Sequence, residues 1–274
     1  MSKKILIFGG SGFIGSSLTN ALCKKGHQIC VVCRDDQKAL GKLGAKKGLQ
    51  VKAIDIFNKN AVRNLVKDYD VIINLIGKLF EAKKGDFVKF HYKFPEFLSK
   101  TISDKQHLIH VSALGIEESC ETSIYAQTKL DGQKAIIKNS KNYNIIKPSI
   151  VFGDCDNFFN LFAKMSKISP FLPLIGGGKA KFAPIYVDDL TESIILLAED
   201  GAKYKNKIFE SYGPDASSFE ELMQFILKIT GRERFLIKLP FSIAKIQAKL
   251  LNFFKIYLLT PDQVEILKYN NIAS

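Results

Sequence analysis

Three side chains in the middle of the chain have the types and spacing needed for proton transfer beside a hydride donor. Tyr125 and Lys129 are four residues apart, so a helix places them on one face, and Ser112 precedes Tyr125 by 13 residues. A free phenol titrates near pH ~10, and a lysine cation close to it lowers that pKa. Tyr125 could then exchange a proton with a carbonyl group while Ser112 donates a hydrogen bond to the carbonyl oxygen. The alternative is a chance pairing, because Tyr and Lys four residues apart occur on many helices.

A glycine-rich turn near the start of the chain is suited to holding a pyrophosphate. It follows the apolar run Lys4–Phe8 and opens a predicted helix, Phe13–Lys25. Gly9 permits a tight turn, Gly12 lets the backbone approach a phosphate, and Gly15 lets the helix pack closely on a sheet. The helix N-terminus adds free N–H groups and a partial positive charge. We predict a dinucleotide site with loop contacts from Gly9, Gly10, Ser11, Gly12, Phe13, Ile14 and Gly15. A glycine turn without a ligand is the alternative.

The residue after the second strand should choose between the two nicotinamide dinucleotides. A carboxylate there suits the ribose diol of NAD(H), and a cation suits the 2′-phosphate of NADP(H). Arg34 follows the β-branched run and can bind a phosphate with two parallel N–H groups, whereas Asp35 comes one residue later. The sequence therefore favours NADP(H) over NAD(H), and a one-residue shift that brings Asp35 to the ribose is the alternative.

Short apolar runs alternate with helical segments over the first half of the chain. This alternation predicts an α/β fold, a Rossmann-type doubly wound parallel sheet with right-handed crossovers. We assign residues 1–150 to the dinucleotide-binding domain and 151–274 to a smaller, mostly helical substrate or partner region packed on it. The lysine-rich stretch 34–48 and the segment Phe171–Pro173 are predicted to be loops.

Composition and charge limit the classes of protein to which the chain can belong. Its 274 residues are 46% hydrophobic and 24% charged, which excludes collagen-like, low-complexity and disulfide-stapled chains. Forty Lys and Arg against 27 Asp and Glu give a net charge of +13, which suits anionic partners, although a solvated lysine-rich surface is equally expected. No helix-turn-helix, zinc finger or aromatic stacking motif is present, so nucleic acid is not an expected partner.

The five cysteines and the N-terminus indicate a reducing compartment. Their number is odd, and Met-Ser-Lys-Lys leads directly into an apolar strand without a secretory signal, so we expect free thiols in the cytoplasm or a matrix-like space. Cys30 and Cys33 have the spacing of a metal pair, but on a strand they point to opposite faces. We therefore predict no metal site.

A basic segment near the C-terminus has an apolar stripe at helical spacing. The stripe is formed by Ile243, Ile246, Leu250, Phe253 and Tyr257, with Lys245, Lys249 and Lys255 away from it. Such a helix can lie on an anionic membrane surface or dock on a partner helix. Base rates favour a third alternative, in which the stripe packs onto its own domain.

These motifs resemble the short-chain dehydrogenase/reductase superfamily, in its extended, atypical branch. The resemblance covers roughly residues 1 to 200. It implies that Ser112, Tyr125 and Lys129 are the catalytic set and that Tyr125 and Lys129 also contact the cofactor. The other cofactor contacts that it implies are the glycine loop, Asp55, Ile56, Leu75, Ile76, Gly77 and Pro148. The family also has an asparagine that completes a proton relay. No asparagine occurs between Lys78 and Val111, and His91 stands in its place.

A narrower resemblance concerns the segments Phe152–Asn160, Gly176–Gly178 and Leu259–Val264. They are similar to the subgroup that includes the nucleotide-binding accessory subunit of respiratory complex I. This resemblance implies an accessory or assembly role in NADH–ubiquinone oxidoreductase, with NADP(H) held rather than turned over, and respiratory subunits or the inner membrane surface as partners. An active NADPH-dependent oxidoreductase or epimerase acting on a quinone precursor, sugar nucleotide or other carbonyl compound is the alternative.

Overall fold

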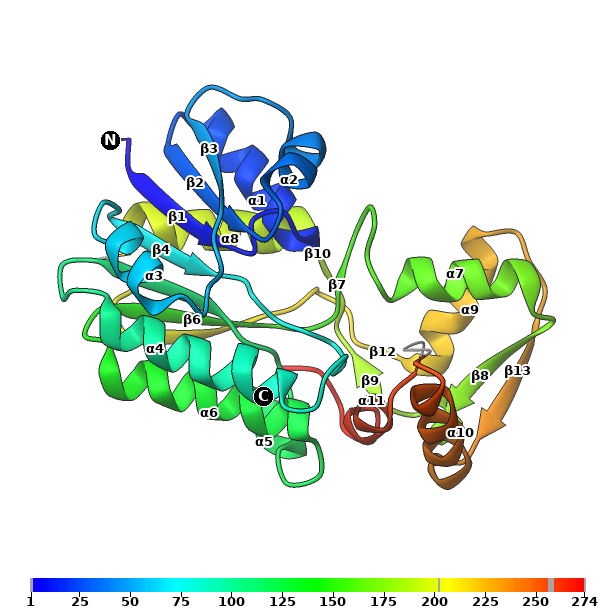
Figure 1. The fold of residues 1–274 in the computed structure, drawn as a ribbon. Coiled ribbons are helices and arrows are strands. Elements are labelled where there is room, and N and C mark those ends of the chain that lie inside the picture. The colour runs from blue at the N-terminus through cyan, green and yellow to red at the C-terminus, as the bar shows by residue number, and fades with distance from the viewer. Residues whose placement is uncertain (1, 202, 256–258, 274) are drawn as a thin grey trace.

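The core of the protein is a seven-stranded parallel sheet with the order β11-β6-β5-β4-β1-β2-β3 (Figure 1). The structure is a computed structural model that describes residues 2–201, 203–255 and 259–273. Side chains of each central strand alternate between the two faces: Ile5 and Ile7 enter one apolar cluster, Leu6 and Phe8 the other. Burial on both faces explains the continuous apolar runs in the sequence. The strands are β1 (Lys4–Phe8), β2 (Gln28–Cys33), β3 (Leu49–Ala53), β4 (Val71–Asn74), β5 (His107–Val111), β6 (Tyr143–Pro148) and β11 (Lys207–Ser211).

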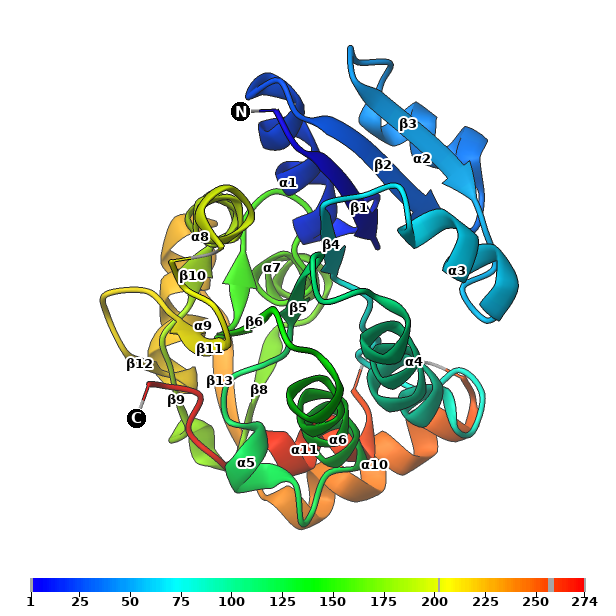
Figure 2. The ribbon, with the colours of Figure 1, turned by 90° about the vertical axis from the view of Figure 1, so that its left-hand side faces the viewer.

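Helices cover both faces of this sheet, which confirms the predicted α/β Rossmann-type fold (Figure 2). One face is covered by α1 (Phe13–Lys24), α2 (Asp36–Leu43) and α8 (Val187–Asp200), with Leu18 and Ile194 in the apolar layer. The other face is covered by α3 (Lys59–Val66), the π-helix η1 (Val88–Lys93), α4 (Phe94–Thr101) and α6 (Ile124–Asn139). A short helix, α5 (Ile116–Ser119), precedes α6.

Two parts of the sheet domain differ from the sequence-based expectation. The stretch predicted as a lysine-rich loop contains α2, because Asp35 accepts a hydrogen bond from the backbone N of Lys38 at 2.9 Å and caps the helix. The range 151–274 is also not a separate region throughout. Its α8 packs on α1 and its β11 pairs with β6, so both complete the sheet domain.

The remaining C-terminal residues form a smaller layer of helices and short sheets beside the sheet domain (Figure 1). Phe171–Pro173, predicted as a loop, lies in β8, because β8 pairs in parallel with β13 and buries Leu172 and Leu174 against α9. The elements are β7 (Val151–Phe152), α7 (Phe159–Ile168), β8 (Phe171–Ile175), η2 (Gly176–Gly178), β9 (Lys181–Phe182), β10 (Ile185–Tyr186), β12 (Ser217–Ser218), α9 (Phe219–Ile229), β13 (Phe235–Leu239), α10 (Phe241–Phe253) and α11 (Pro261–Ile266).

Helix α10 turns its apolar stripe outward, whereas the sequence analysis favoured packing of this stripe against the protein's own domain. It buries Ala244 and Ala248, whereas Ile246 is 67% exposed and Phe253 80% exposed. The expectation that the apolar stripe packs onto its own domain is therefore wrong, because the domain contacts the small residues on the other side of the helix. Tyr257, the last member of the predicted stripe, lies outside the described residues. Within the described ranges, no helix is both long and apolar enough to cross a bilayer.

Candidate dinucleotide site

The glycine loop between β1 and α1 has the close backbone packing that a pyrophosphate cradle requires. Gly9 has a φ of +84°, and its carbonyl oxygen accepts a hydrogen bond from the Gly12 N–H at 3.0 Å. A Cβ atom added to Gly15 would lie 2.2 Å from the Gly9 oxygen, and one added to Gly10 would lie 2.7 Å from the Val31 side chain. Only glycines at these positions let α1 begin directly against the turn, as the spacing predicted.

The N-terminus of α1 carries no intrinsic negative charge. Its N-cap residue is Gly12, which provides no side-chain cap, and the first turn contains no Asp or Glu. The first N–H groups of the helix are therefore available to an anion. We expect Ser11, Phe13 and Ile14 to contribute backbone N–H groups or contacts at this end of the site.

A lysine that the sequence analysis did not single out lies against this loop. Lys42 on α2 donates from Nζ to the carbonyl oxygens of Ser11, at 2.9 Å, and Gly12, at 3.4 Å. Its charge stands beside the turn that would hold the pyrophosphate. Recognition of Asp35 as an N-cap would have predicted α2 and placed Lys42 near the loop.

The adenosine end lies at the carboxyl ends of β2, β3 and β4. Arg34 is exposed immediately after β2, and Asp35 is engaged as the cap of α2. Asp55 follows β3 and stabilises its own turn by accepting a hydrogen bond from the Phe57 N–H at 3.0 Å, while the neighbouring Ile56 is partly buried. The structure thus brings the predicted Arg34 and Asp55–Ile56 to the same edge of the sheet as the glycine loop.

Residues after β4 form the next wall of the site. Leu75 donates from its backbone N to the Phe8 oxygen at 2.9 Å, and its carbonyl carbon would lie 3.3 Å from a Cβ on Gly9. The Ile76 N–H is held by the side chain of Asn74 at 3.1 Å. Gly77 faces Lys129, whose Nζ would lie 3.5 Å from a Cβ on Gly77. These contacts join the phosphate end to the nicotinamide end.

At the end of the site predicted to hold the nicotinamide, Lys129 lies against the strand end that carries Ser112, whereas the Tyr125 phenol makes no hydrogen bond to either residue in the described part of the chain. Lys129 is buried on α6 and donates from Nζ to the Val111 oxygen, at 3.2 Å, and the Ser112 oxygen, at 3.5 Å. Burial lowers the pKa of Lys129 to about 8. The Ser112 Oγ atom is buried and has no hydrogen-bond partner among the described residues. An unpartnered buried hydroxyl at this point fits a site completed by the nicotinamide end of a dinucleotide or by a carbonyl group.

His91 is in contact with Tyr125, where the family's asparagine was expected to be replaced. The two rings meet edge to face with centroids 5.1 Å apart, and Phe87 also contacts Tyr125. The His91 Nε2 atom accepts from the Lys78 N–H at 3.0 Å, and its Nδ1 atom lies 3.2 Å from Thr128 Oγ1. Burial, followed by the Lys129 charge, lowers the pKa of His91 to about 2. His91 is therefore a neutral packing residue beside the phenol.

Asp262, from the C-terminal region, caps the helix that carries Tyr125. Its carboxylate accepts hydrogen bonds from the Ser123 hydroxyl at 2.8 Å, the Ile124 N–H at 2.7 Å and the Tyr125 N–H at 3.1 Å. Burial and then the Asp262 charge raise the pKa of Tyr125 to about 12. The expectation that Lys129 lowers this pKa is thus wrong, because burial and a nearby carboxylate dominate. Asp262 lies in Leu259–Val264, so the sequence marked the segment but not its contact.

Two further observations define the limits of the site. Pro148 ends β6 at the same edge of the sheet, and its carbonyl oxygen accepts from the Leu114 N–H at 2.9 Å.

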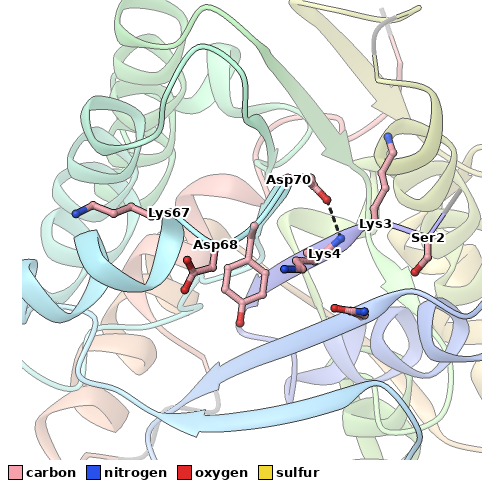
Figure 3. Close-up of a pocket in the computed structure, with 8 residues that line it drawn as sticks. Ser2, Lys3, Lys4, Lys67, Asp68 and Asp70 are labelled. Carbon is pink, nitrogen blue, oxygen red and sulfur yellow. Dashed lines mark hydrogen bonds between the residues drawn. The ribbon is translucent and has the colours of Figure 1, made fainter.

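A separate hollow, lined by Lys4, Asp68 and Asp70 among others, lies at the amino ends of the strands (Figure 3). Ligands of this fold bind at the carboxyl ends, so the hollow does not belong to the dinucleotide site. In the described part of the chain, no three His, Cys, Asp or Glu side chains form a metal-binding group.

Comparisons with known proteins show which sequences and folds the chain resembles. Residues 1–111 match the model of the NmrA-like family. The chain is 29% identical over 253 residues to the mitochondrial NADH dehydrogenase (ubiquinone) 1 alpha subcomplex subunit 9 of Arabidopsis thaliana, covering 88% of this chain and 61% of that protein. The mouse subunit of the same name is 28% identical over 277 residues, covering 97% of this chain and 72% of that protein. The chain thus spans less than two thirds of the Arabidopsis relative.

A solved structure shows the same fold. The dTDP-glucose 4,6-dehydratase of Bacillus anthracis, solved in complex with NAD, superimposes with a TM-score of 0.73 at 17% identity, covering 87% of this chain and 85% of that one. The fold is thus the Rossmann-type α/β fold of this dehydratase, in which a dinucleotide binds at the carboxyl ends of the strands. Residues 1–111 are similar to the NmrA-like family, and most of the chain is similar to the mitochondrial subunits named above.

Proposed function

We propose that this protein holds a nicotinamide dinucleotide and acts as an accessory or assembly protein of an NADH–ubiquinone oxidoreductase. The observation that carries the proposal is the glycine cradle, in which Gly15 permits the α1 N-terminus to start against Gly9. The two mitochondrial relatives named above are subunits of this oxidoreductase by name, which supports the cellular role. When bound, the nicotinamide supplies hydride chemistry, and the loop residues bind and orient the pyrophosphate.

The adenosine end supports NADP(H) in preference to NAD(H). Arg34 is exposed after β2, where a cation can contact a 2′-phosphate, and Lys42 adds a second positive charge near the loop. Asp35, the carboxylate that could serve a ribose diol, is occupied by the N-cap of α2. The charge of this end therefore favours the phosphorylated cofactor.

The nicotinamide end supports holding over turnover. A phenol with a pKa of about 12 is a poor base at neutral pH, and Asp262 opposes its ionisation. His91, which replaces the relay asparagine, is a neutral ring rather than a polar link to solvent.

The test uses the full chain purified without added nucleotide. Mass spectrometry of the denatured protein should release NADP(H), and a pull-down from membranes should recover subunits of NADH–ubiquinone oxidoreductase. Arg34→Ala should weaken NADP(H) binding by about tenfold or more and leave NAD(H) binding nearly unchanged, because only the 2′-phosphate contact is lost. A protein that carries no nucleotide and binds none would overturn the proposal.

An active NADPH-dependent oxidoreductase or epimerase is the second candidate, and one observation favours it. The Ser112 Oγ atom is buried without a partner in a set that also contains Tyr125 and Lys129, as expected for a hydroxyl reserved for a carbonyl oxygen. The test is a screen of quinone precursors, sugar nucleotides and other carbonyl compounds with the Tyr125→Phe variant beside the wild type. Turnover that survives this substitution would remove Tyr125 as the acid or base.

A further inference from the structure

Helix α10 exposes its large apolar side chains and buries its small ones. The exposed set, called the α10 face below, consists of Ile243, Ile246, Leu250, Phe253 and Phe254, each more than half exposed. The buried positions Ala244 and Ala248 pack on Ile175 and Val264. A helix that served only its own domain would turn the larger residues inward, because burial of apolar area is the main stabilising term. The α10 face is therefore built for something outside this chain's own core.

The segment that carries this face contains basic residues and no acidic ones. From Arg234 to Lys255 the sequence contains no Asp or Glu, and its cations are Arg234, Lys238, Lys245, Lys249 and Lys255. Lys245 is paired with Glu265 at 2.6 Å. Lys249 lies three residues after Ile246 and next to Leu250, and Lys255 follows Phe254, so both stand at the border of the apolar set.

The neighbouring two-stranded sheet extends the apolar surface. Phe171 on β8 and Phe235 on β13 are exposed with ring centroids 5.9 Å apart, and Ile237 is exposed on the same side of β13. The far end of this sheet face, formed by Ile175 and Leu239, packs with α10. The exposed strand residues thus lie on the sheet face on which α10 packs, and β8, β13 and α10 lie together on the right-hand side of Figure 1.

We propose that the α10 face is a docking surface for an anionic lipid bilayer. The helix would lie in the plane of the interface, with its Ile, Leu and Phe side chains among the acyl chains and Lys249 and Lys255 at the phosphate level. The charge selects this occupant. A second copy of the chain across a two-fold axis would bring the same lysines against one another, whereas an anionic headgroup layer neutralises all of them. This proposal does not rest on the nucleotide function.

The experiment measures co-sedimentation of the full chain with two kinds of vesicle, phosphatidylcholine alone and phosphatidylcholine with about one third phosphatidylglycerol. We expect binding to the anionic vesicles that weakens as salt is raised. Leu250→Asp should reduce the partition coefficient by at least about tenfold, since it removes an apolar side chain from the interface and adds a like charge to the lipid. Lys249→Gln should reduce it by roughly fivefold.

The matched control is Leu196→Asp on α8, because Leu196 is also a half-exposed leucine on a helix but lies in the sheet domain, away from α10. It should bind the anionic vesicles as the wild type does. Circular dichroism checks that each variant keeps its fold, as expected for exposed positions. Absence of binding, or equal binding to neutral vesicles, would overturn the proposal. So would a homodimer in analytical ultracentrifugation that Leu250→Asp dissociates while vesicle binding is unchanged.

Discussion

The two ends of the candidate dinucleotide site treat charge in opposite ways. At the phosphate end, uncapped N–H groups of α1 and the Lys42 ammonium stand ready for an anion. At the nicotinamide end, burial shifts each titratable group toward its neutral form: the pKa of Tyr125 is raised to about 12, and that of Lys129 is lowered to about 8. The first end is suited to binding and the second is poorly suited to moving protons at neutral pH. The difference supports the proposal that the site holds a dinucleotide rather than turning it over.

The largest expected effect comes from filling the cradle at the phosphate end. Gly15→Ala would place a methyl group 2.2 Å from the Gly9 oxygen, so α1 must move away from the turn. We expect nucleotide binding to be lost and the free energy of unfolding to fall by about 3 kcal/mol, as in other overpacked sites. Calorimetric titration and urea unfolding measure the two quantities.

Gly41→Ala provides the control for that variant. Gly41 lies inside α2, and apart from its neighbours and the backbone of the helix itself, no atom lies within 4 Å of the position that its Cβ would take. Alanine should therefore stabilise the helix by roughly 0.5–1 kcal/mol without changing nucleotide affinity. If Gly15→Ala binds nucleotide as well as Gly41→Ala does, the phosphates do not rest at α1.

At the nicotinamide end, removing a buried charge should stabilise the protein. Burial lowers the pKa of Lys129 from 10.5 to about 8, so the charged form of this side chain destabilises the folded protein. Lys129→Met should raise the free energy of unfolding at pH 7 by roughly 2 kcal/mol, after the loss of the hydrogen bond to Val111 is subtracted. Thermal unfolding measures this gain. A stability loss would mean that the Lys129 charge is favourable in the unliganded site.

The pH dependence of the same site follows from the same shift. Between pH 8 and about 10.5 the unfolded chain keeps the Lys129 proton while the native protein releases it, so stability rises with pH in this window. Lys129→Met should remove this rise. The comparison between wild type and variant isolates Lys129 from other groups that titrate in the same range.

A smaller effect is expected where the C-terminal region meets the reaction centre. Asp262→Ala removes the acceptor for Ser123, Ile124 and Tyr125. The helix start loses this cap, so the free energy of unfolding should decrease by about 1–2 kcal/mol. Asp262→Asn keeps one acceptor oxygen and loses the charge, so it should cost less and lower the pKa of Tyr125. Phenolate absorbance, taken as the difference from the same variant with Tyr125→Phe, measures the titration. An unchanged Tyr125 titration would assign the raised pKa to burial alone.

The sequence predicted the geometry of the glycine turn better than the surroundings of Tyr125, for a physical reason. The glycine cradle is local: four glycines within seven residues specify the turn, the helix start and the close packing. The state of Tyr125 depends instead on Asp262, 137 residues away, and on burial created by Phe87 and His91. Spacing on one helix placed Tyr125 beside Lys129 but carried no information about either contact.

The C-terminal layer shows the same limit in its packing. Helical periodicity correctly placed Ile246 and Leu250 on one face of α10 but could not say which face the domain would contact. Strands β8 and β13 were missed because each is stabilised mainly by the other and by α9, contacts that are distant in sequence. Structure that depends on neighbouring residues can be predicted from the sequence pattern, whereas structure that depends on partners distant in the sequence cannot.

The smallest expected effect concerns acid stability at the nicotinamide end. The pKa of His91 is lowered from 6.5 to about 2, first by burial, so below pH 6.5 the unfolded chain binds a proton that the native protein does not. Stability should therefore decrease as the pH is lowered below 6.5, by at most ~1.4 kcal/mol per pH unit for this histidine. His91→Gln keeps an acceptor for the Lys78 N–H and does not titrate. Urea unfolding at pH 7.5 and 5.5 should show an acid loss about 1 kcal/mol smaller in the variant. Equal losses in the two proteins would mean that His91 takes up a proton in the folded state, and the contrast between a charged and a neutral end of the site would then no longer hold.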